Sequence, residues 1–301
     1  MPSGVLLLDK PLGLSSNAAL QRVRSLFDRE KAGHVGSLDP LATGMLPICL
    51  GEATKIAGDI LAGRKCYRFT MALGSATSTA DAEGEVTRTA AVPTLSAAGV
   101  NAVLASFHGT RQQVPPMYSA LKQAGQPLYR LARAGISVPR AARTIELAHL
   151  ALCALTQASL ELEVLCSKGT YVRVLAEDIA AGLGTVAHVT ALRRLWVEPF
   201  ANAPMHSLAS LEDLRARAER PALLAPDAPL QHLPAVTLSG MDAQRILMGQ
   251  RVFADCAAAP RVRLYAPSGA FLGLGATDGA GGLEPRRLMR GAGQLGGVSL
   301  P

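Results

Sequence analysis

The polar bend between Gly33 and Leu46, GHVGSLDPLATGML, carries a side chain well suited to chemistry, the carboxylate of Asp39. Pro40 fixes its own φ and favours an extended conformation at Asp39, and the glycines accept backbone angles closed to other residues. The pattern therefore predicts a rigid loop between two apolar segments. A carboxylate in such a loop can take part in catalysis, or it can merely cap the turn. The local pattern leaves both roles open.

A second candidate group lies where a predicted strand meets a predicted helix. Residues 159–166, SLELEVLC, alternate in polarity as a half-buried strand does. Gly169 ends this strand, and a helix is expected to begin near Thr170. Tyr171 and Arg173 then lie at the junction, from which side chains can project into a cleft. Taken singly, either side chain is more often a packing residue or part of a surface ion pair.

A third feature is the basic arm, residues 111–143, which has six basic side chains, no acidic one, and Tyr118 and Tyr129 interleaved. Basic side chains bind phosphates and aromatic rings stack on bases, so the pattern favours an RNA-binding segment. A solvated basic helix packed against the body is the alternative. The basic residues of the arm are Arg111, Lys122, Arg130, Arg133, Arg140 and Arg143.

The elements that must position these groups alternate between strand and helix. Strands are predicted at 4–9, 45–51 and 65–74, with a serine-capped helix at 15–27 and a second helix at 52–62. This alternation indicates a mixed α/β (α+β) fold.

The end of the chain is expected to form a separate small module. A proline-rich linker, PDAPLQHLP, follows a helix-like segment at 210–220. Beyond it, a short helix and strand at 239–252 precede two strands joined at Ser268 and Gly269. We therefore predict a large domain over 1–230 and a small β-rich domain over 231–301.

The composition is that of a globular protein, with 49% hydrophobic and 18% charged residues among 301. The net charge of +7 suits a polyanionic partner. The five scattered cysteines contain no CxxC pair and no histidines cluster, so neither a zinc site nor a disulfide framework is expected. No signal-peptide core or membrane-length apolar run is found, and we expect a cytoplasmic protein.

Several segments occur in an order that resembles the TruB family of tRNA pseudouridine synthases. They are GVLLLDKPLGLSS, GHVGSLDPLATGMLPICLGEATK, KCYRFTMALG, VPPMYSALK, CSKGTYVR and AHVTALRRL, within residues 4–200. The C-terminal module is similar, more loosely, to the PUA-like RNA-binding domain of that family. The chain resembles the stand-alone bacterial type, so the resemblance implies a monomer with a largely antiparallel central sheet flanked by helices.

The resemblance also implies an activity, the isomerisation of uridine 55 in the T arm of tRNA. The N1–C1′ bond breaks, the uracil turns, and a C5–C1′ bond forms. This reaction needs no cofactor or metal, and the sequence contains neither GxxxxGK[ST] nor a helix-opening GxGxxG.

The matching positions suggest a role for each candidate residue. Asp39 matches the nucleophile, although the resemblance does not say whether it attacks C6, attacks C1′ or removes a sugar proton. Arg173 matches its arginine partner, which would neutralise and orient the carboxylate. The other matches are Tyr67, which stacks on the target base and helps to remove the C5 proton; Tyr171 and Leu192, which line the pocket; His34, which fills the vacated stack; and Lys10, which supports the pocket.

Two rival functions remain open at this stage. One is a non-catalytic tRNA-binding protein or RNA-folding chaperone, for which a missing aspartate or arginine would be the expected sign; both residues are present. The other is a pseudouridine synthase that acts on another RNA, which mapping of pseudouridine in cellular RNA would distinguish.

Overall fold

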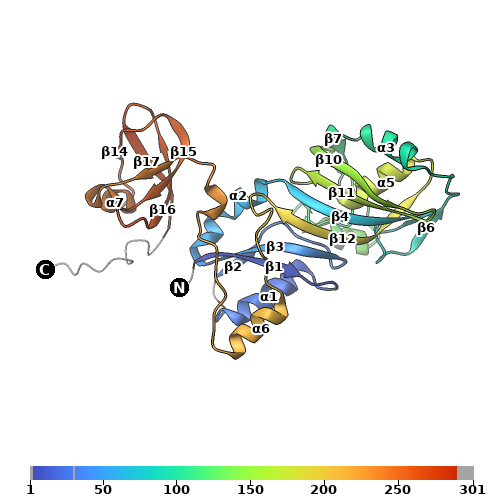
Figure 1. The fold of residues 1–301 in the computed structure, drawn as a ribbon, viewed down its shortest axis with the longest axis horizontal. Helices are drawn as coiled ribbons and strands as arrows, with labels where there is room; N and C mark the ends of the chain where they lie inside the picture. Colours follow the sequence, from blue (N-terminus) through green and yellow to red (C-terminus); the bar gives the residue numbers. More distant parts are fainter. Residues whose placement is uncertain (1–2, 30, 290–301) are drawn as a thin grey trace.

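The computed structural model describes residues 3–29 and 31–289, which form a large sheet and a small one (Figure 1). The large sheet consists of β1 (Gly4–Lys10), β2 (Ala32–His34), β3 (Ala42–Leu50), β4 (Lys65–Leu73), β7 (Gly109–Gln113), β10 (Arg143–Leu155), β11 (Ser159–Cys166) and β12 (Ala187–Val197). The small sheet consists of β13 (Ala235–Thr237), β14 (Val252–Phe253), β15 (Ala259–Tyr265), β16 (Phe271–Thr277) and β17 (Gly282–Leu288).

Helices and two hairpins complete the described fold. The helices are α1 (Ser16–Leu26), α2 (Ala57–Ala62), α3 (Ala97–Ala105), α4 (Leu128–Arg133), α5 (Val172–Gly182), α6 (Leu208–Ala216) and α7 (Gly240–Leu247), with 3-10 turns η1 (Gly51–Ile56) and η2 (Ala228–Leu230). The hairpins pair β5 (Ser75–Thr77) with β6 (Val86–Thr89), and β8 (Lys122–Gln123) with β9 (Gln126–Pro127).

The large sheet has the strand order β1-β3-β12-β4-β11-β10-β7, and β2 pairs with β3. Every neighbouring pair is antiparallel except β12 with β3, which run parallel. The predicted mixed fold with a largely antiparallel central sheet is therefore confirmed.

Local sequence patterns account for many of these elements. On β11, Leu160, Leu162 and Val164 are fully buried while their neighbours are partly exposed, as the alternation predicts. Helix α1 begins after Ser15, whose side chain accepts a hydrogen bond from the backbone of Ala18. Apolar residues from α1, α3, α5 and α6 meet the sheet in one core cluster. Figure 1 shows α1 and α6 beside β1 and β3, and α3 and α5 at the β7–β10 end.

The small sheet packs against the body through a second core cluster. Leu274 and Met289 belong to the same buried cluster as Val5 and Ile56 of the large domain. Arg261 forms an ion pair with Asp59 of α2 at 2.6 Å. Figure 1 shows the small sheet at the end of the molecule where α2 lies. The two parts therefore share apolar packing, and the division at residues 230 and 231 stays a prediction.

Candidate functional site

The loop that carries Asp39 is held in place by hydrogen bonds to the residues on either side of Asp39. The hydroxyl of Ser16, at the start of α1, donates to the carbonyl of Leu38 at 3.0 Å and accepts from its N–H at 2.7 Å. The N–H of Gly13 donates to the carbonyl of Pro40 at 2.9 Å. Main-chain groups on both sides of Asp39 are thus fixed by the segment that joins β1 to α1, and the predicted well-held loop is present.

Lys10 lies beneath the same loop and is fully buried. Its Nζ donates to the carbonyls of Pro11, Leu14 and Pro40 at 2.9, 2.6 and 3.4 Å. Burial lowers the pKa of Lys10 to about 8, although the Asp39 carboxylate opposes this shift. Because Lys10 is absent from the cavity wall described below, its position fits support of the loop.

A glycine lets β12 approach the loop. Gly44 has φ of +98°, and a side chain there would collide with the backbone of Arg194, its partner in the parallel pairing of β3 with β12. This close approach places Leu192 and Arg194 next to the Asp39 loop. Arg194 is 1% exposed and donates to the carbonyls of Met45 and Gly36 at 2.6 and 2.9 Å.

Asp39 and Arg173, far apart in sequence, meet in the folded chain. The Nε of Arg173 lies 3.0 Å from Oδ2 of Asp39. Arg173 comes from the first turn of α5, which begins at Val172, and it is 4% exposed. Its Nη1 donates to the carbonyl of Thr79 and its Nη2 to that of Tyr118, both at 2.7 Å. The guanidinium is therefore oriented by three segments of the chain.

A second carboxylate, Asp81, lies on the same arginine, 3.5 Å from Nε, and is 2% exposed. Its Oδ1 accepts hydrogen bonds from the Thr79 hydroxyl at 2.5 Å and the Glu83 N–H at 3.1 Å. Asp81 lies in the polar segment STADAEGE and was not among the predicted site residues. Arg173 thus faces two carboxylates, of which only Asp39 reaches the cavity.

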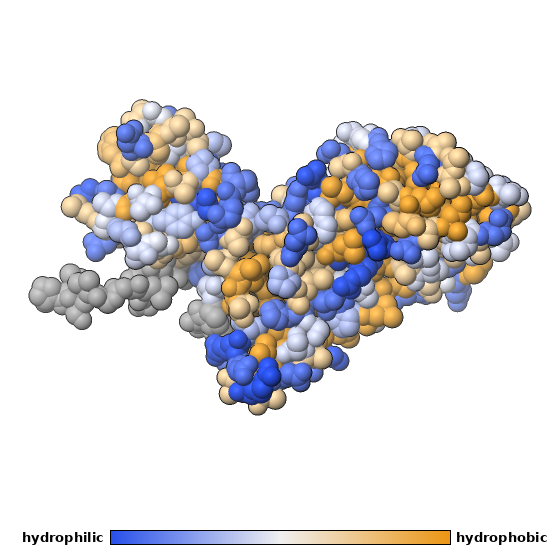
Figure 2. Space-filling model, in the orientation of Figure 1, coloured by the Kyte–Doolittle hydropathy of each residue, from blue (hydrophilic) through white to orange (hydrophobic). Residues whose placement is uncertain are grey.

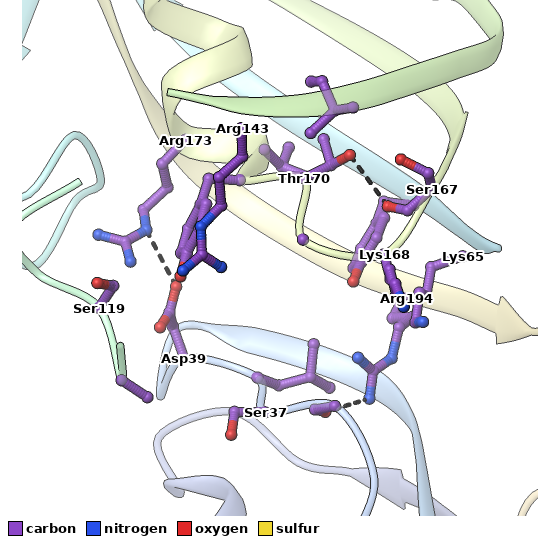
Figure 3. Close-up of a pocket in the computed structure, with 18 of the residues that line it drawn as sticks. Ser37, Asp39, Lys65, Ser119, Arg143, Ser167, Lys168, Thr170, Arg173 and Arg194 are labelled. Carbon is purple, nitrogen blue, oxygen red and sulfur yellow. Dashed lines mark hydrogen bonds and ion pairs between the residues drawn. The ribbon is translucent and has the colours of Figure 1, made fainter. Parts of the chain in front are cut away.

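The cavity above Asp39 has a volume of about 650 Å³. Asp39, Arg173, Tyr67, Tyr171 and Leu192, all predicted site residues, line it together. Figure 3 shows Asp39 and Arg173 on one side, with Lys168, Lys65 and Arg194 on the other. Ser119 of the basic arm also lines the wall. Its buried hydroxyl has no hydrogen-bond partner of normal geometry in the described chain.

Burial shapes the protonation of the site. The pKa of Asp39 is raised by burial and by Asp81, while Arg173 and Lys10 oppose the rise. The side chain still has 42% of its surface exposed, because it faces an open cavity. Burial also raises the pKa of Tyr67, so this phenol is neutral. The neutral phenol can stack on a base or relay a proton, but it is not already ionised to a phenolate that could act as a base.

His34, at the end of β2, lies outside the wall of this cavity. Burial and the charge of Arg194 lower its pKa, so the imidazole is neutral. Its Nδ1 is buried without a hydrogen-bond partner in the described residues.

The residues of the basic arm occupy different surroundings. Arg143, at the start of β10, lines the cavity, whereas Arg111 on β7 lies 4.0 Å above the ring of Phe107. Lys122, Arg130 and Arg133 are exposed on the β8–β9 hairpin and α4, and Arg140 is partly buried. The two ends of the arm therefore belong to the sheet, and the hairpin and α4 lie between them.

Sequence reasoning missed Asp81, Lys65, Lys168 and Arg194. The last three lie within the motifs KCYRF, CSKGTYVR and AHVTALRRL, where their charge in otherwise apolar or glycine-containing segments was the available signal. In the described chain, no His, Cys, Asp and Glu side chains are grouped to hold a metal ion. No helix there combines the length and apolarity needed to cross a bilayer.

Comparison with known proteins identifies the family to which the chain belongs. Residues 24–172 match the model of the TruB family pseudouridylate synthase N-terminal domain, 173–231 that of the tRNA pseudouridylate synthase B C-terminal domain, and 234–289 that of the pseudouridine synthase II TruB C-terminus. The chain belongs to the TruB family of pseudouridine synthases.

Two relatives show how similar the chain is to proteins of this family in sequence. The tRNA pseudouridine synthase B of Chromohalobacter salexigens is 50% identical over 292 residues, 96% of this chain and 95% of that protein. The enzyme of the same name from Aromatoleum aromaticum is also 50% identical, over 95% of this chain and 92% of its own. The fold is shared with a chain in the crystal structure of a Cbf5-Nop10-Gar1 complex, with a TM-score of 0.72 at 22% identity, covering 95% of this chain and 84% of that one.

Proposed function

We propose that this protein converts uridine 55 in the T arm of tRNA to pseudouridine. The observation that carries the proposal is the Asp39–Arg173 ion pair of 3.0 Å at the wall of a 650 Å³ cavity, in a chain of the TruB family. Pseudouridine synthases are isomerases, and the reaction rearranges one nucleotide without a net transfer to another molecule.

The chemistry assigned to Asp39 requires an ionised carboxylate. Burial opposes ionisation, and Arg173 compensates by its charge and by a hydrogen bond. The carboxylate attacks C6 of the base, attacks C1′ of the sugar or removes a sugar proton. In each route the N1–C1′ bond breaks, the detached uracil turns within the cavity, and C5 bonds to C1′. C5 then loses its proton, and Asp39 is regenerated when its adduct bond breaks or when it returns the sugar proton.

The remaining residues hold the nucleotide. Uridine 55 must leave its stack in the T loop to reach Asp39, at a cost of about a few kcal/mol. Tyr67 stacks on the flipped uracil, and Leu192 and Tyr171 complete the wall around it. His34, outside the cavity and neutral, takes the place that the base vacates. Lys10 keeps the Asp39 loop in position through Pro40.

The exposed cations of the basic arm are assigned to the RNA backbone. Lys122, Arg130 and Arg133 lie on the hairpin and α4, and the small C-terminal sheet adds a second contact away from the chemistry. Figure 2 shows a hollow, bordered by hydrophilic side chains, between that sheet and the part of the body that carries β7 and β10. We place the protein in the cytoplasm, where it acts on tRNA as a monomer.

The test is formation of product at a defined position. Purified protein is incubated with tRNA transcripts labelled with tritium at C5 of uridine, tritium release is measured, and pseudouridine is then mapped in the product. Release with pseudouridine at position 55 supports the proposal. Modification at another position, or mapping of the protein's products to another RNA in cells, contradicts it.

A further inference from the structure

The cavity wall carries far more positive charge than the Asp39–Arg173 ion pair accounts for. Its wall holds five cationic side chains, Lys65, Arg143, Lys168, Arg173 and Arg194, and Asp39 as its one acid. Arg173 is neutralised by Asp39 and Asp81. The other four form no ion pair with any carboxylate in residues 3–29 and 31–289. They leave an uncompensated positive charge in the cavity wall.

Two of these cations are buried and held by main-chain carbonyls. Lys65 is 5% exposed, and its Nζ donates to the carbonyls of Leu61 and Gly63 at 2.6 and 2.5 Å. Arg194 makes the carbonyl contacts described above. Burying a charge without an opposite charge is costly, and an anionic ligand in the cavity would supply the opposite charge. The pKa of Lys65 is lowered to about 8, first by burial, then by Arg194, with a smaller effect of Lys168.

The other two cations are exposed, and Figure 3 draws Lys168 beside this buried pair but Arg143 on the side of Asp39 and Arg173. Arg143 is the first residue of β10, and Lys168 lies in the turn between β11 and α5. That turn is fixed to β10, because Ser167 and Glu146 exchange hydrogen bonds of 2.9 Å, from the Ser167 N–H to the Glu146 carbonyl and from the Glu146 N–H to the Ser167 hydroxyl. Figure 3 shows Lys168, Lys65 and Arg194 together on the side of the cavity away from Arg173.

We propose that Lys168, backed by the buried charges of Lys65 and Arg194, forms a subsite for a phosphodiester group flanking the flipped nucleotide. This inference rests on the proposed function and names the part of the substrate that this side of the cavity takes. A phosphodiester carries the negative charge that the wall lacks, and it enters the cavity attached to the nucleotide that Asp39 acts on. Lysine and arginine are the side chains that bind such groups.

The subsite has a consequence for catalysis. A phosphate held opposite Arg173 fixes one end of the nucleotide while the glycosidic bond at Asp39 breaks. The sugar and phosphate are then kept in place as the free uracil turns. Loss of the subsite should therefore weaken binding and slow turnover, without changing the position that is modified.

The experiment uses T-arm stem-loops in which one phosphodiester at a time is replaced by an uncharged methylphosphonate. The replaced linkages are the one 5′ to the target uridine, the one 3′ to it, and a remote linkage in the stem. Affinity and single-turnover rate are measured for the wild type, Lys168→Ala, Arg143→Ala and Lys31→Ala. Lys31 is an exposed lysine outside the cavity wall and serves as the matched control.

For the wild type, we expect one of the two flanking replacements to reduce affinity for the stem-loop about tenfold. The remote replacement should not have this effect. Lys168→Ala should weaken binding of the unmodified RNA, lower the salt slope by about one, and lose little further affinity from the same replacement. Arg143→Ala, which alters the Asp39 side of the cavity, should stay as sensitive to that replacement as the wild type. The same replacement should reduce the affinity of Lys31→Ala as much as it reduces that of the wild type. Both cavity variants alter exposed side chains, so they should fold.

The inference is overturned if neither flanking replacement affects the wild type, or if Lys168→Ala remains as sensitive to the replacement as the wild type. In either outcome, tritium release by the wild type on unmodified RNA still decides the proposed function separately.

Discussion

Arg173 donates from Nη2 to the main-chain carbonyl of Tyr118 at 2.7 Å, which ties the basic arm to the arginine that pairs with Asp39. The same guanidinium donates to the carbonyl of Thr79. One buried side chain therefore joins the Asp39 loop, the turn that carries Asp81, and the arm that is assigned to RNA. The carboxylate and the arm therefore share one contact group.

Replacing Arg173 with lysine tests this shared contact. A lysine keeps the charge, but its single nitrogen cannot reach Asp39, Thr79 and Tyr118 at once. We expect the single-turnover rate to fall by about 10²–10³-fold while tRNA binding changes little. Tritium release and filter binding on the same preparation measure the two effects. A rate close to that of the wild type would show that charge alone suffices.

Asp39→Asn removes the charge and nucleophilicity of the side chain but keeps its shape. The loop should still fold, because its hydrogen bonds come from Ser16 and Gly13 to main-chain groups. Turnover should drop below detection, since an amide can neither form the adduct nor accept the sugar proton. Binding of tRNA, measured by filter retention, should persist. Joint loss of binding and of the folded state would instead make Asp39 a structural residue.

The pH dependence of the single-turnover rate should reflect the raised pKa of Asp39. The reaction needs the ionised carboxylate, so the rate should fall as the pH drops through a value above the ordinary range for aspartate. Because the folded-state pKa is raised, protonation of this group does not by itself destabilise the folded protein, and activity should be lost before the fold.

Asp81→Asn provides the matched variant for this measurement. Asp81 raises the pKa of Asp39, so its neutral replacement should move the acidic limb to lower pH. The asparagine oxygen can still accept hydrogen bonds from Thr79 and Glu83. Rate–pH profiles of the two proteins test the coupling, and a limb that moves to higher pH would contradict it.

Arg130→Ala with Arg133→Ala tests the arm. Both side chains are exposed on α4, and Arg133 lies 5.7 Å from the ring centroid of Tyr129. Each lost phosphate contact should reduce the salt slope of tRNA binding by about one, with weaker affinity at fixed salt. Titrations at several salt concentrations measure this slope. An unchanged affinity and slope would leave α4 as an ordinary surface helix.

Truncation after Leu230 tests the domain division. Removal of residues 231–301 takes Leu274, Met289 and Phe271 out of the shared cluster, a loss of about 3–6 kcal/mol of apolar burial. We expect a lower melting temperature, yet retained turnover on a T-arm stem-loop at temperatures where the shortened protein is folded. Folded protein without any turnover on the stem-loop would show that the chemistry needs the small sheet.

Features that depend on local backbone preference and on periodicity could be predicted from the sequence. The alternation of residues 159–166 predicted the half-buried strand β11, and Asp39-Pro40 with its glycines predicted a well-held loop. The concentration of basic residues in 111–143 and the order of the family motifs were also visible without a structure. These properties arise from interactions within a few residues, so they can be recognised along the chain.

The sequence did not show which charges meet and which remain unpaired, because these contacts form only in the folded chain. The contact of Arg173 with Asp39, Asp81 and Tyr118 joins segments that lie far apart in sequence. Asp81 lies in the polar segment STADAEGE, yet it is almost completely buried. Lys65 and Arg194 gain their significance from burial beside the cavity, and the small sheet shares the core of the large domain through Leu274 and Met289. Burial and charge pairing depend on the packing of distant segments, which no local pattern specifies.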